Sequence, residues 1–199
     1  MNYSFYGLRR SGNHAIIEWL MKNITNNVNE NVLKTITLTT YGNTCFFNSL
    51  TKNVLYKSFM PRFKKLTPQY DNIIVSYEDV EYDHELEIAK NFKKIIIIRD
   101  LPNVLASRCK RMQTTKDKTL IKEMDMNINL LNIWCQMAYA EDKGFILIKY
   151  EDWLLNKGYR DKICQKLKIA NRDIINTVRH HGYGSSFIGP KLAKKQDLI

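Results

Sequence analysis

The sequence predicts an α/β fold with three layers, in which helices flank a mainly parallel central sheet. Two runs, "NIIVSY" (72–77) and "KIIIIRD" (94–100), are apolar at successive positions, which is typical of parallel strands covered by helices on both faces. Strand-like and helix-like segments also alternate along the chain. The chain has 199 residues, of which 44% are hydrophobic and 26% charged, so we expect one domain over 1–199.

The first half of the chain contributes three further segments. "YSFYG" (3–7) reads as the first strand, and "NHAIIEWLMKN" (13–23) spaces its apolar residues on one helical face. "LKTITLTT" (33–40) alternates like a strand. Residues 41–70 are basic and aromatic with two prolines, and we expect an irregular surface stretch with room for a short helix.

In the second half, Asp100 is placed to cap a helix that begins at Pro102 and continues to about residue 112. Residues 119–142 read as one long helix that ends at Gly144. "FILIKY" (145–150) is expected to be the last strand. Short helices are then predicted at 151–156, 159–169 and 171–181, and the tail 182–199 is expected to be irregular.

Composition limits the environment and the partners. The net charge of +11 favours anionic partners, or reflects a lysine-rich surface that is merely solvated. No CxxC pair occurs among the cysteines, so we expect reduced thiols and no zinc site; they are Cys45, Cys109, Cys135 and Cys164. Neither a secretory signal pattern nor an 18-residue apolar run is present, so we expect a cytoplasmic protein without a membrane segment.

The loop between the first strand and the first helix has the glycine spacing of a phosphate-binding loop. Gly7 and Gly12 are separated by four residues, so that backbone N–H groups and the helix N-terminus can face an anion, and Arg10 adds a bidentate donor. The alternative is a tight turn with two exposed arginines. Asn13 and His14 replace the lysine and hydroxyl residue of a nucleotide hydrolase, so the loop suits an activated phosphate held without a metal.

Three motifs resemble one family when taken in order. "RRSGNHAI" (9–16) is similar to the phosphosulfate loop of sulfotransferases that use 3′-phosphoadenosine 5′-phosphosulfate (PAPS). "IRDLPNVLAS" (98–107) resembles their strand that ends in Arg, with Ser eight positions later, and "ILIKYEDWL" (146–154) looks like their YED turn. The resemblance implies a P-loop NTPase-like sulfotransferase fold and a single sulfotransferase-like domain. It assigns Arg9, Arg10, Ser11, Gly12, Asn13 and His14 to the phosphosulfate, and Arg99 and Ser107 to the 3′-phosphate.

The chain departs from that family at two places. Soluble members usually have Lys where this chain has Arg10, and Thr-Thr where it has Asn13-His14. The basic glycine loop that closes over the nucleotide has no strict match. "HHGYGSSF" (180–187), with Gly184 and Ser185, is the candidate replacement, and a simple turn in the tail is the alternative.

The resemblance implies in-line transfer of a sulfuryl group, with Arg10 stabilising the departing phosphate and no metal required. A general base must take the proton of the acceptor hydroxyl. Glu78 is the first candidate, followed by Asp79 and His84, and each of them could instead be a solvated or capping residue. His14 is a further candidate, although its position in the loop favours contact with an oxygen.

The acceptor is weakly specified. Residues 41–70 and 110–118 carry Lys, Arg and aromatic side chains that suit a sugar or an anionic glycan, and equally a phenol or plain solvent. Two other functions remain open: a P-loop nucleotide-dependent kinase, and a non-enzymatic module that binds polyanions. No nucleic-acid partner is expected, because the sequence has neither an aromatic RNP-type strand nor a helix-turn-helix signature. The oligomeric state also stays open.

Overall fold

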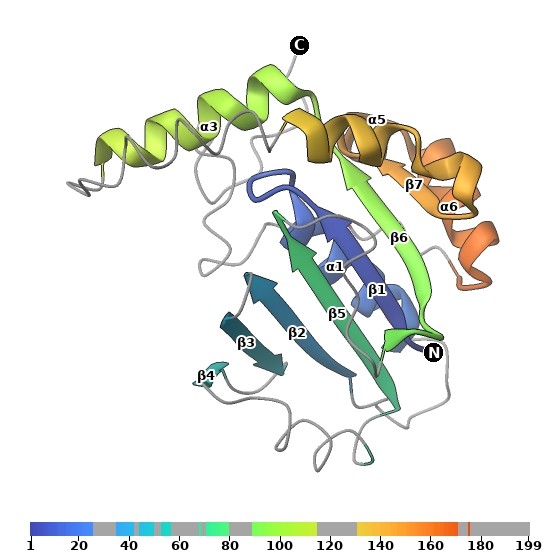
Figure 1. Cartoon of the computed structure of the whole chain (residues 1–199). Helices are drawn as coiled ribbons and strands as arrows, with labels where there is room; N and C mark the ends of the chain where they lie inside the picture. The colour runs from blue at the N-terminus through green and yellow to red at the C-terminus, as the bar shows by residue number, and fades with distance from the viewer. Residues whose placement is uncertain are drawn as a thin grey trace.

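A computed structural model describes residues 1–25, 35–41, 44–49, 53–56, 68, 71–79, 89–114, 131–170 and 175 (Figure 1). The strands are β1 (Tyr3–Gly7), β2 (Thr35–Tyr41), β3 (Thr44–Ser49), β4 (Asn53–Tyr56), β5 (Asn72–Glu78), β6 (Lys93–Ile98) and β7 (Ile146–Lys149). The helices are α1 (Asn13–Thr25), α3 (Leu101–Thr114), η3 (Ala140–Lys143), α5 (Tyr150–Leu155) and α6 (Lys157–Leu167), and residues 131–138 are also helical.

The seven strands form one sheet in the order β4-β3-β2-β5-β1-β6-β7. The five strands from β2 to β7 in this order run parallel, whereas β3 and β4 are antiparallel additions at the β2 edge. The expectation of an irregular stretch over 41–70 is therefore wrong for 44–49 and 53–56. Their β-branched and aromatic residues favour strands, and antiparallel pairing of β3 with β2 and of β4 with β3 fixes them.

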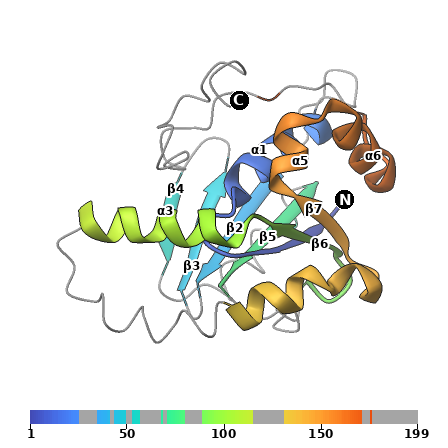
Figure 2. The same ribbon diagram turned by 90° about the horizontal axis from the view of Figure 1, so that it is seen from above.

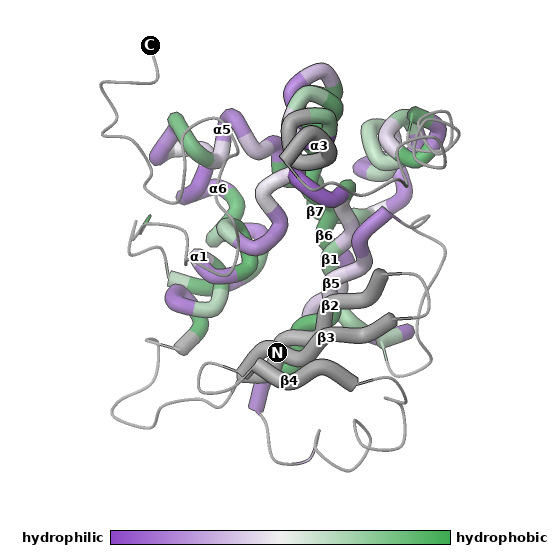
Figure 3. Tube along the Cα trace, turned by 90° about the vertical axis from the view of Figure 1, so that its left-hand side faces the viewer, coloured by the Kyte–Doolittle hydropathy of each residue, from purple (hydrophilic) through white to green (hydrophobic). Residues whose placement is uncertain are grey.

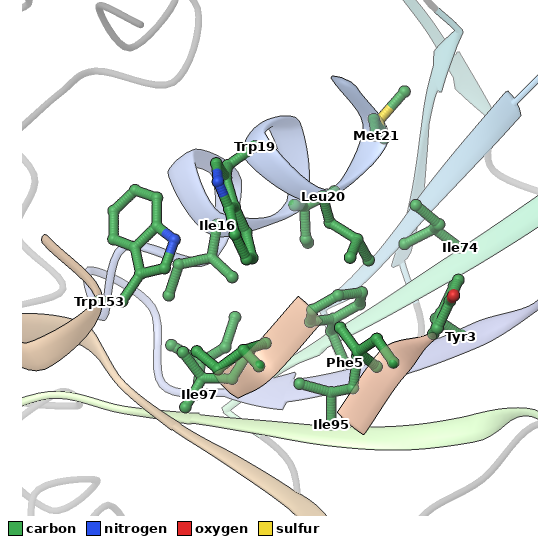
Figure 4. Close-up of a cluster of buried hydrophobic side chains, with 14 of the residues drawn as sticks. Tyr3, Phe5, Ile16, Trp19, Leu20, Met21, Ile74, Ile95, Ile97 and Trp153 are labelled. Carbon is green, nitrogen blue, oxygen red and sulfur yellow. The ribbon is translucent and has the colours of Figure 1, made fainter. Parts of the chain in front are cut away.

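One face of the sheet packs against α1, α5 and α6, which lie together on one side of the strands in Figure 3. The apolar stripe of α1 meets the first strand here, since Ile16 and Leu20 pack in the same buried cluster as Phe5. Trp19 and Trp153 meet edge to face with ring centroids 6.0 Å apart (Figure 4). This cluster fixes α1, and with it the loop that precedes α1, against the sheet.

The opposite face is covered by α3, by residues 131–138 and by the start of η3. Val104 and Met137 pack against side chains of β1 and β5, among which Tyr6 and Tyr77 stack at 4.6 Å. Strands such as β5 and β6 are therefore buried on both faces, as their consecutive apolar residues predicted. Parallel strands with helices on each side confirm the α/β class.

Local signals at the helix ends are confirmed in part. Asp100 caps α3, because its Oδ2 accepts a hydrogen bond from Asn103 N at 3.1 Å. The helix expected over 119–142 is present at 131–138 and then tightens into η3, which ends at Gly144 with φ of 83°. Residues 115–130 lie outside the described part of the chain. Among the helices that are described, none is long and apolar enough to span a bilayer.

Candidate functional site

Three strands, β5, β1 and β6, end side by side beneath α3 and α5, and predicted site residues lie at all three ends (Figures 1 and 2). Gly7, the last residue of β1, is in register with Glu78 on one side and Ile97 on the other. Arg99 follows directly after β6. Ligands of open parallel sheets bind at this edge, outside the carboxyl ends of the strands.

The loop from Gly7 to Gly12 turns sharply into α1. Ser11 N donates to Leu8 O at 3.0 Å, and the first turn of α1 closes on Gly12 O, which accepts from the backbone N–H groups of Ala15 and Ile16. Arg10 and Gly12 have φ of 76° and 85°. The left-handed conformation at Arg10 is uncommon for a residue with a side chain, and such backbone conformations concentrate at functional sites.

Both loop glycines lack the room for a side chain. A Cβ at Gly7 would lie 2.3 Å from Asn13 Oδ1, and a Cβ at Gly12 would lie 2.2 Å from the ring of Tyr150. The glycine spacing that the sequence shows is thus required by packing: Asn13 covers the first glycine, and the start of α5 covers the second.

The structure brings together the two groups of predicted anion-binding residues. Arg10 Nε donates to Ser107 Oγ at 3.0 Å, and Arg99 Nη1 donates to Arg10 O at 3.0 Å. Ser107 is buried on the inner face of α3. Arg10 thus contacts Ser107, which lies 97 positions away in the sequence, and Arg99, which lies 89 positions away. Together they form one continuous cationic site.

The ring of Tyr150 packs against the guanidinium of Arg99 at this junction. The guanidinium carbon of Arg99 lies 4.8 Å from the centroid of the Tyr150 ring, and Trp134 Nε1 donates to Arg99 O at 2.8 Å. Burial raises the pKa of the Tyr150 hydroxyl, an effect that Arg99 opposes and Glu151 reinforces, so the phenol stays protonated at neutral pH. Arg99 is held from two sides and cannot swing freely.

A clamp that the sequence did not predict holds the outer side of the loop. Asp79 accepts a hydrogen bond from Arg9 N at 2.9 Å and pairs with Arg108. Arg108 also donates to Arg9 O, at 3.3 Å from Nε and 3.1 Å from Nη2. The only sequence signal for it was the basic residue that directly follows Ser107 in "SRCKR". Asp79, a candidate base, is thus engaged in holding the backbone of the loop.

Glu78 lies behind the loop with 4% of its side chain exposed, and it contacts two loop residues. Its Oε1 accepts a hydrogen bond from Asn13 Nδ2 at 3.2 Å and lies 3.6 Å from His14 Nε2. Asn13 Nδ2 also donates to Leu8 O at 3.2 Å. His14 itself is 41% exposed, so the imidazole lies between a buried carboxylate and the solvent.

One loop hydroxyl is available for a ligand. Ser11 is 1% exposed, and its Oγ has no hydrogen-bond partner among the described residues. A buried hydroxyl of this kind fits the oxygen of a bound anion, since burial without a partner is costly. In the described ranges, no three His, Cys, Asp or Glu side chains cluster closely enough to hold a metal ion.

The remaining predicted residues, His84, Gly184 and Ser185, lie outside the described residues. Comparison of the chain with protein-family models, with curated proteins and with solved structures finds no significant match.

Proposed function

We propose that the chain is a sulfotransferase that moves a sulfuryl group from PAPS to an acceptor hydroxyl. The observation that carries this proposal is the junction of Arg10, Ser107 and Arg99, which joins the loop after β1 to the strand end and helix after β6. An adenosine 3′,5′-bisphosphate moiety carries two anionic groups, and the sequence motifs assign one to each side of this junction. The finer fold assignment, a P-loop NTPase-like sulfotransferase fold, is part of the same proposal.

The residues present fit such a donor. The amides at the start of α1, the Ser11 hydroxyl and the Arg10 guanidinium provide donors for the phosphosulfate end. Arg99 and Ser107 provide a charged and a neutral donor for the 3′-phosphate. When bound, PAPS supplies an activated sulfuryl group whose leaving group is a phosphate.

Arg10 acts in this proposal by stabilising the negative charge that grows on the leaving phosphate. Its left-handed backbone and its hydrogen bonds to both α3 and Arg99 fix it before any ligand arrives. A pre-positioned charge of this kind contributes to catalysis because it needs no reorganisation during the reaction. The acceptor is proposed to be a carbohydrate hydroxyl, on the strength of the basic and aromatic composition of 41–70 and 110–118 alone.

The kinase alternative has less support. Asp100, the residue best placed in sequence to hold magnesium, uses its carboxylate to cap α3. The loop has neither the lysine nor the hydroxyl residue that bind phosphates and metal in nucleotide hydrolases. The polyanion-binding alternative predicts an exposed basic surface, whereas Arg99 and Arg108 are only 13% and 14% exposed and are tied to the loop.

One comparison separates the three functions. Thermal unfolding is measured in EDTA with adenosine 3′,5′-bisphosphate, with ATP and magnesium, and with an oligonucleotide at several salt concentrations. The proposal predicts stabilisation by the bisphosphate in EDTA, and loss of PAPS turnover in Arg10→Ala with the fold retained. Stabilisation by ATP and magnesium alone would falsify it.

A further inference from the structure

We propose that His14, rather than Glu78, takes the proton from the acceptor hydroxyl, and that Glu78 is a positioning residue that holds the His14 ring. This inference rests on the proposed function and assigns the base within it. His14 is the only histidine in the part of the chain that the structure describes, and it is the second residue of α1, three positions after Ser11 in the sequence.

Exposure distinguishes the two candidates. Glu78 is 4% exposed and its Oε1 already accepts from Asn13 Nδ2 at 3.2 Å, so an acceptor hydroxyl would have to displace the loop to reach it. The His14 side chain is 41% exposed and extends from the same loop into solvent. Among the two, His14 is therefore the group that an acceptor arriving from solvent can contact.

The geometry also orients the imidazole. Nε2 is the ring nitrogen that lies 3.6 Å from the Glu78 carboxylate, and that carboxylate favours a proton on Nε2. The lone pair is then on Nδ1, which is the nitrogen available as a base. A buried carboxylate behind a solvent-facing imidazole is the arrangement in which the carboxylate fixes the tautomer and stabilises the charge that forms.

Proton transfer to His14 accompanies transfer of the sulfuryl group. The acceptor oxygen forms a bond to sulfur while its proton passes to His14 Nδ1. The bond between sulfur and the bridging oxygen breaks, and its electron pair stays on the phosphate that Arg10 stabilises. The His14 imidazolium then returns its proton to solvent. Glu78 keeps its charge throughout and supports the imidazolium.

The test compares two acceptors and includes a readout without turnover. Wild type, His14→Gln, Glu78→Gln and the control Glu141→Gln are assayed with labelled PAPS and either N-acetylglucosamine or 4-nitrophenol at a pH where the phenol is ionised. Glu141 is a matched control because it is an exposed glutamate paired with Lys166. The tautomer of His14 is read from long-range ¹H–¹⁵N NMR spectra, and stabilisation by adenosine 3′,5′-bisphosphate checks that each variant folds.

We expect His14→Gln to lower transfer to the sugar by about 10²- to 10⁴-fold, the range for loss of a general base, and to change transfer to the ionised phenol much less. Glu78→Gln is expected to lower transfer to the sugar and to remove the preference of the His14 proton for Nε2, whereas Glu141→Gln changes neither.

Three results overturn the inference. One is equal loss with both acceptors in His14→Gln; another is unchanged transfer to the sugar in that variant. The third is a wild-type protein that binds the bisphosphate yet releases none from PAPS with any acceptor, water included. The first two results leave the proposed sulfotransferase function standing and reject only the assignment of the base. The third result refutes the proposed function as well, and absence of bisphosphate binding in the wild type refutes the nucleotide site itself.

Discussion

Replacing Gly12 by Ala tests how the loop is held, and Gly144→Ala provides a matched control. The two glycines have nearly the same left-handed backbone, with φ of 85° and 83°. A Cβ at Gly144 has no atom within 4 Å, whereas one at Gly12 lies 2.2 Å from the Tyr150 ring. The difference between the two substitutions therefore isolates the overlap with Tyr150 from the cost of the backbone conformation.

The expected losses of unfolding free energy follow from the cost of the backbone conformation and from the overlap with Tyr150. A left-handed conformation costs an L-residue about 1–2 kcal/mol, which is the whole effect expected for Gly144→Ala. Overpacking adds about 1–3 kcal/mol at Gly12. For a chain of this length each kcal/mol lowers Tm by about 2–4 °C, so Gly12→Ala should unfold several degrees below Gly144→Ala.

The assay is urea unfolding of wild type, both glycine variants, Tyr150→Ala, and Gly12→Ala combined with Tyr150→Ala. We expect Gly12→Ala to cost at least about 1 kcal/mol less in the Tyr150→Ala background than in the wild type, because the overlapping ring is gone. Gly12→Ala should also lose stabilisation by adenosine 3′,5′-bisphosphate, and Gly144→Ala should keep it. Equal free energies of unfolding for the two single variants would refute the packing argument.

Three further predictions concern the surroundings of the loop. Asp79→Ala and Arg108→Ala should each lower the free energy of unfolding by about 2 kcal/mol, and the double variant by clearly less than the sum; simple additivity would contradict the clamp. Tyr150→Ala should weaken bisphosphate binding about fivefold, because the cation–π contact with Arg99 is lost, while Tyr150→Phe keeps the contact and the affinity. Equal affinities of the two variants would contradict a role of the Tyr150 ring in holding Arg99. Burial raises the pKa of the Cys164 thiol to about 12, so at pH 8 a thiol reagent should label exposed Cys109 and spare Cys164, as peptide mass spectrometry would show.

The same Cys164 shift predicts a pH dependence of stability. An unfolded thiol titrates near 9.0, below the value of about 12 in the folded protein. The contribution of the protonated thiol is therefore fully present below pH 9 and is lost as the pH rises from there toward 12. Unfolding free energy should fall over that range, and Cys164→Ala should reduce the slope; an unchanged slope would contradict the assignment.

Most of the parallel sheet could be predicted from the sequence, because a strand buried on both faces has several consecutive apolar residues. The consecutive apolar residues at 73–75 and 95–98 lie in β5 and β6, which flank β1 in the sheet. The strands β3 and β4 could not be predicted in this way, since they owe their place to antiparallel pairing of β3 with β2 and of β4 with β3 at an edge. The Gly-Asn pair at 42–43 was the one local signal of a hairpin there.

Some residues of the candidate site could likewise be predicted from local sequence, whereas others could not. Gly7 and Gly12 could be found from their spacing in a strand–loop–helix, and Arg99 from its place at the end of an apolar strand, whereas Ser107 was singled out by the resemblance to the sulfotransferase family. The contact between Asp79 and Arg108, by contrast, depends on β5 lying beside β1 in the sheet. No local pattern contains that adjacency, and the contact of Glu78 with His14 follows from the same register.

The most direct test of the proposed nucleotide site is whether Arg99 and Ser107 recognise a 3′-phosphate. Isothermal titration in EDTA compares adenosine 3′,5′-bisphosphate with adenosine 5′-phosphate on wild type and Ser107→Ala. We expect the 3′-phosphate to tighten binding to the wild type by about 10- to 100-fold, the worth of charged hydrogen bonds, and by much less in the variant. Equal affinity of the wild type for the two nucleotides would contradict it.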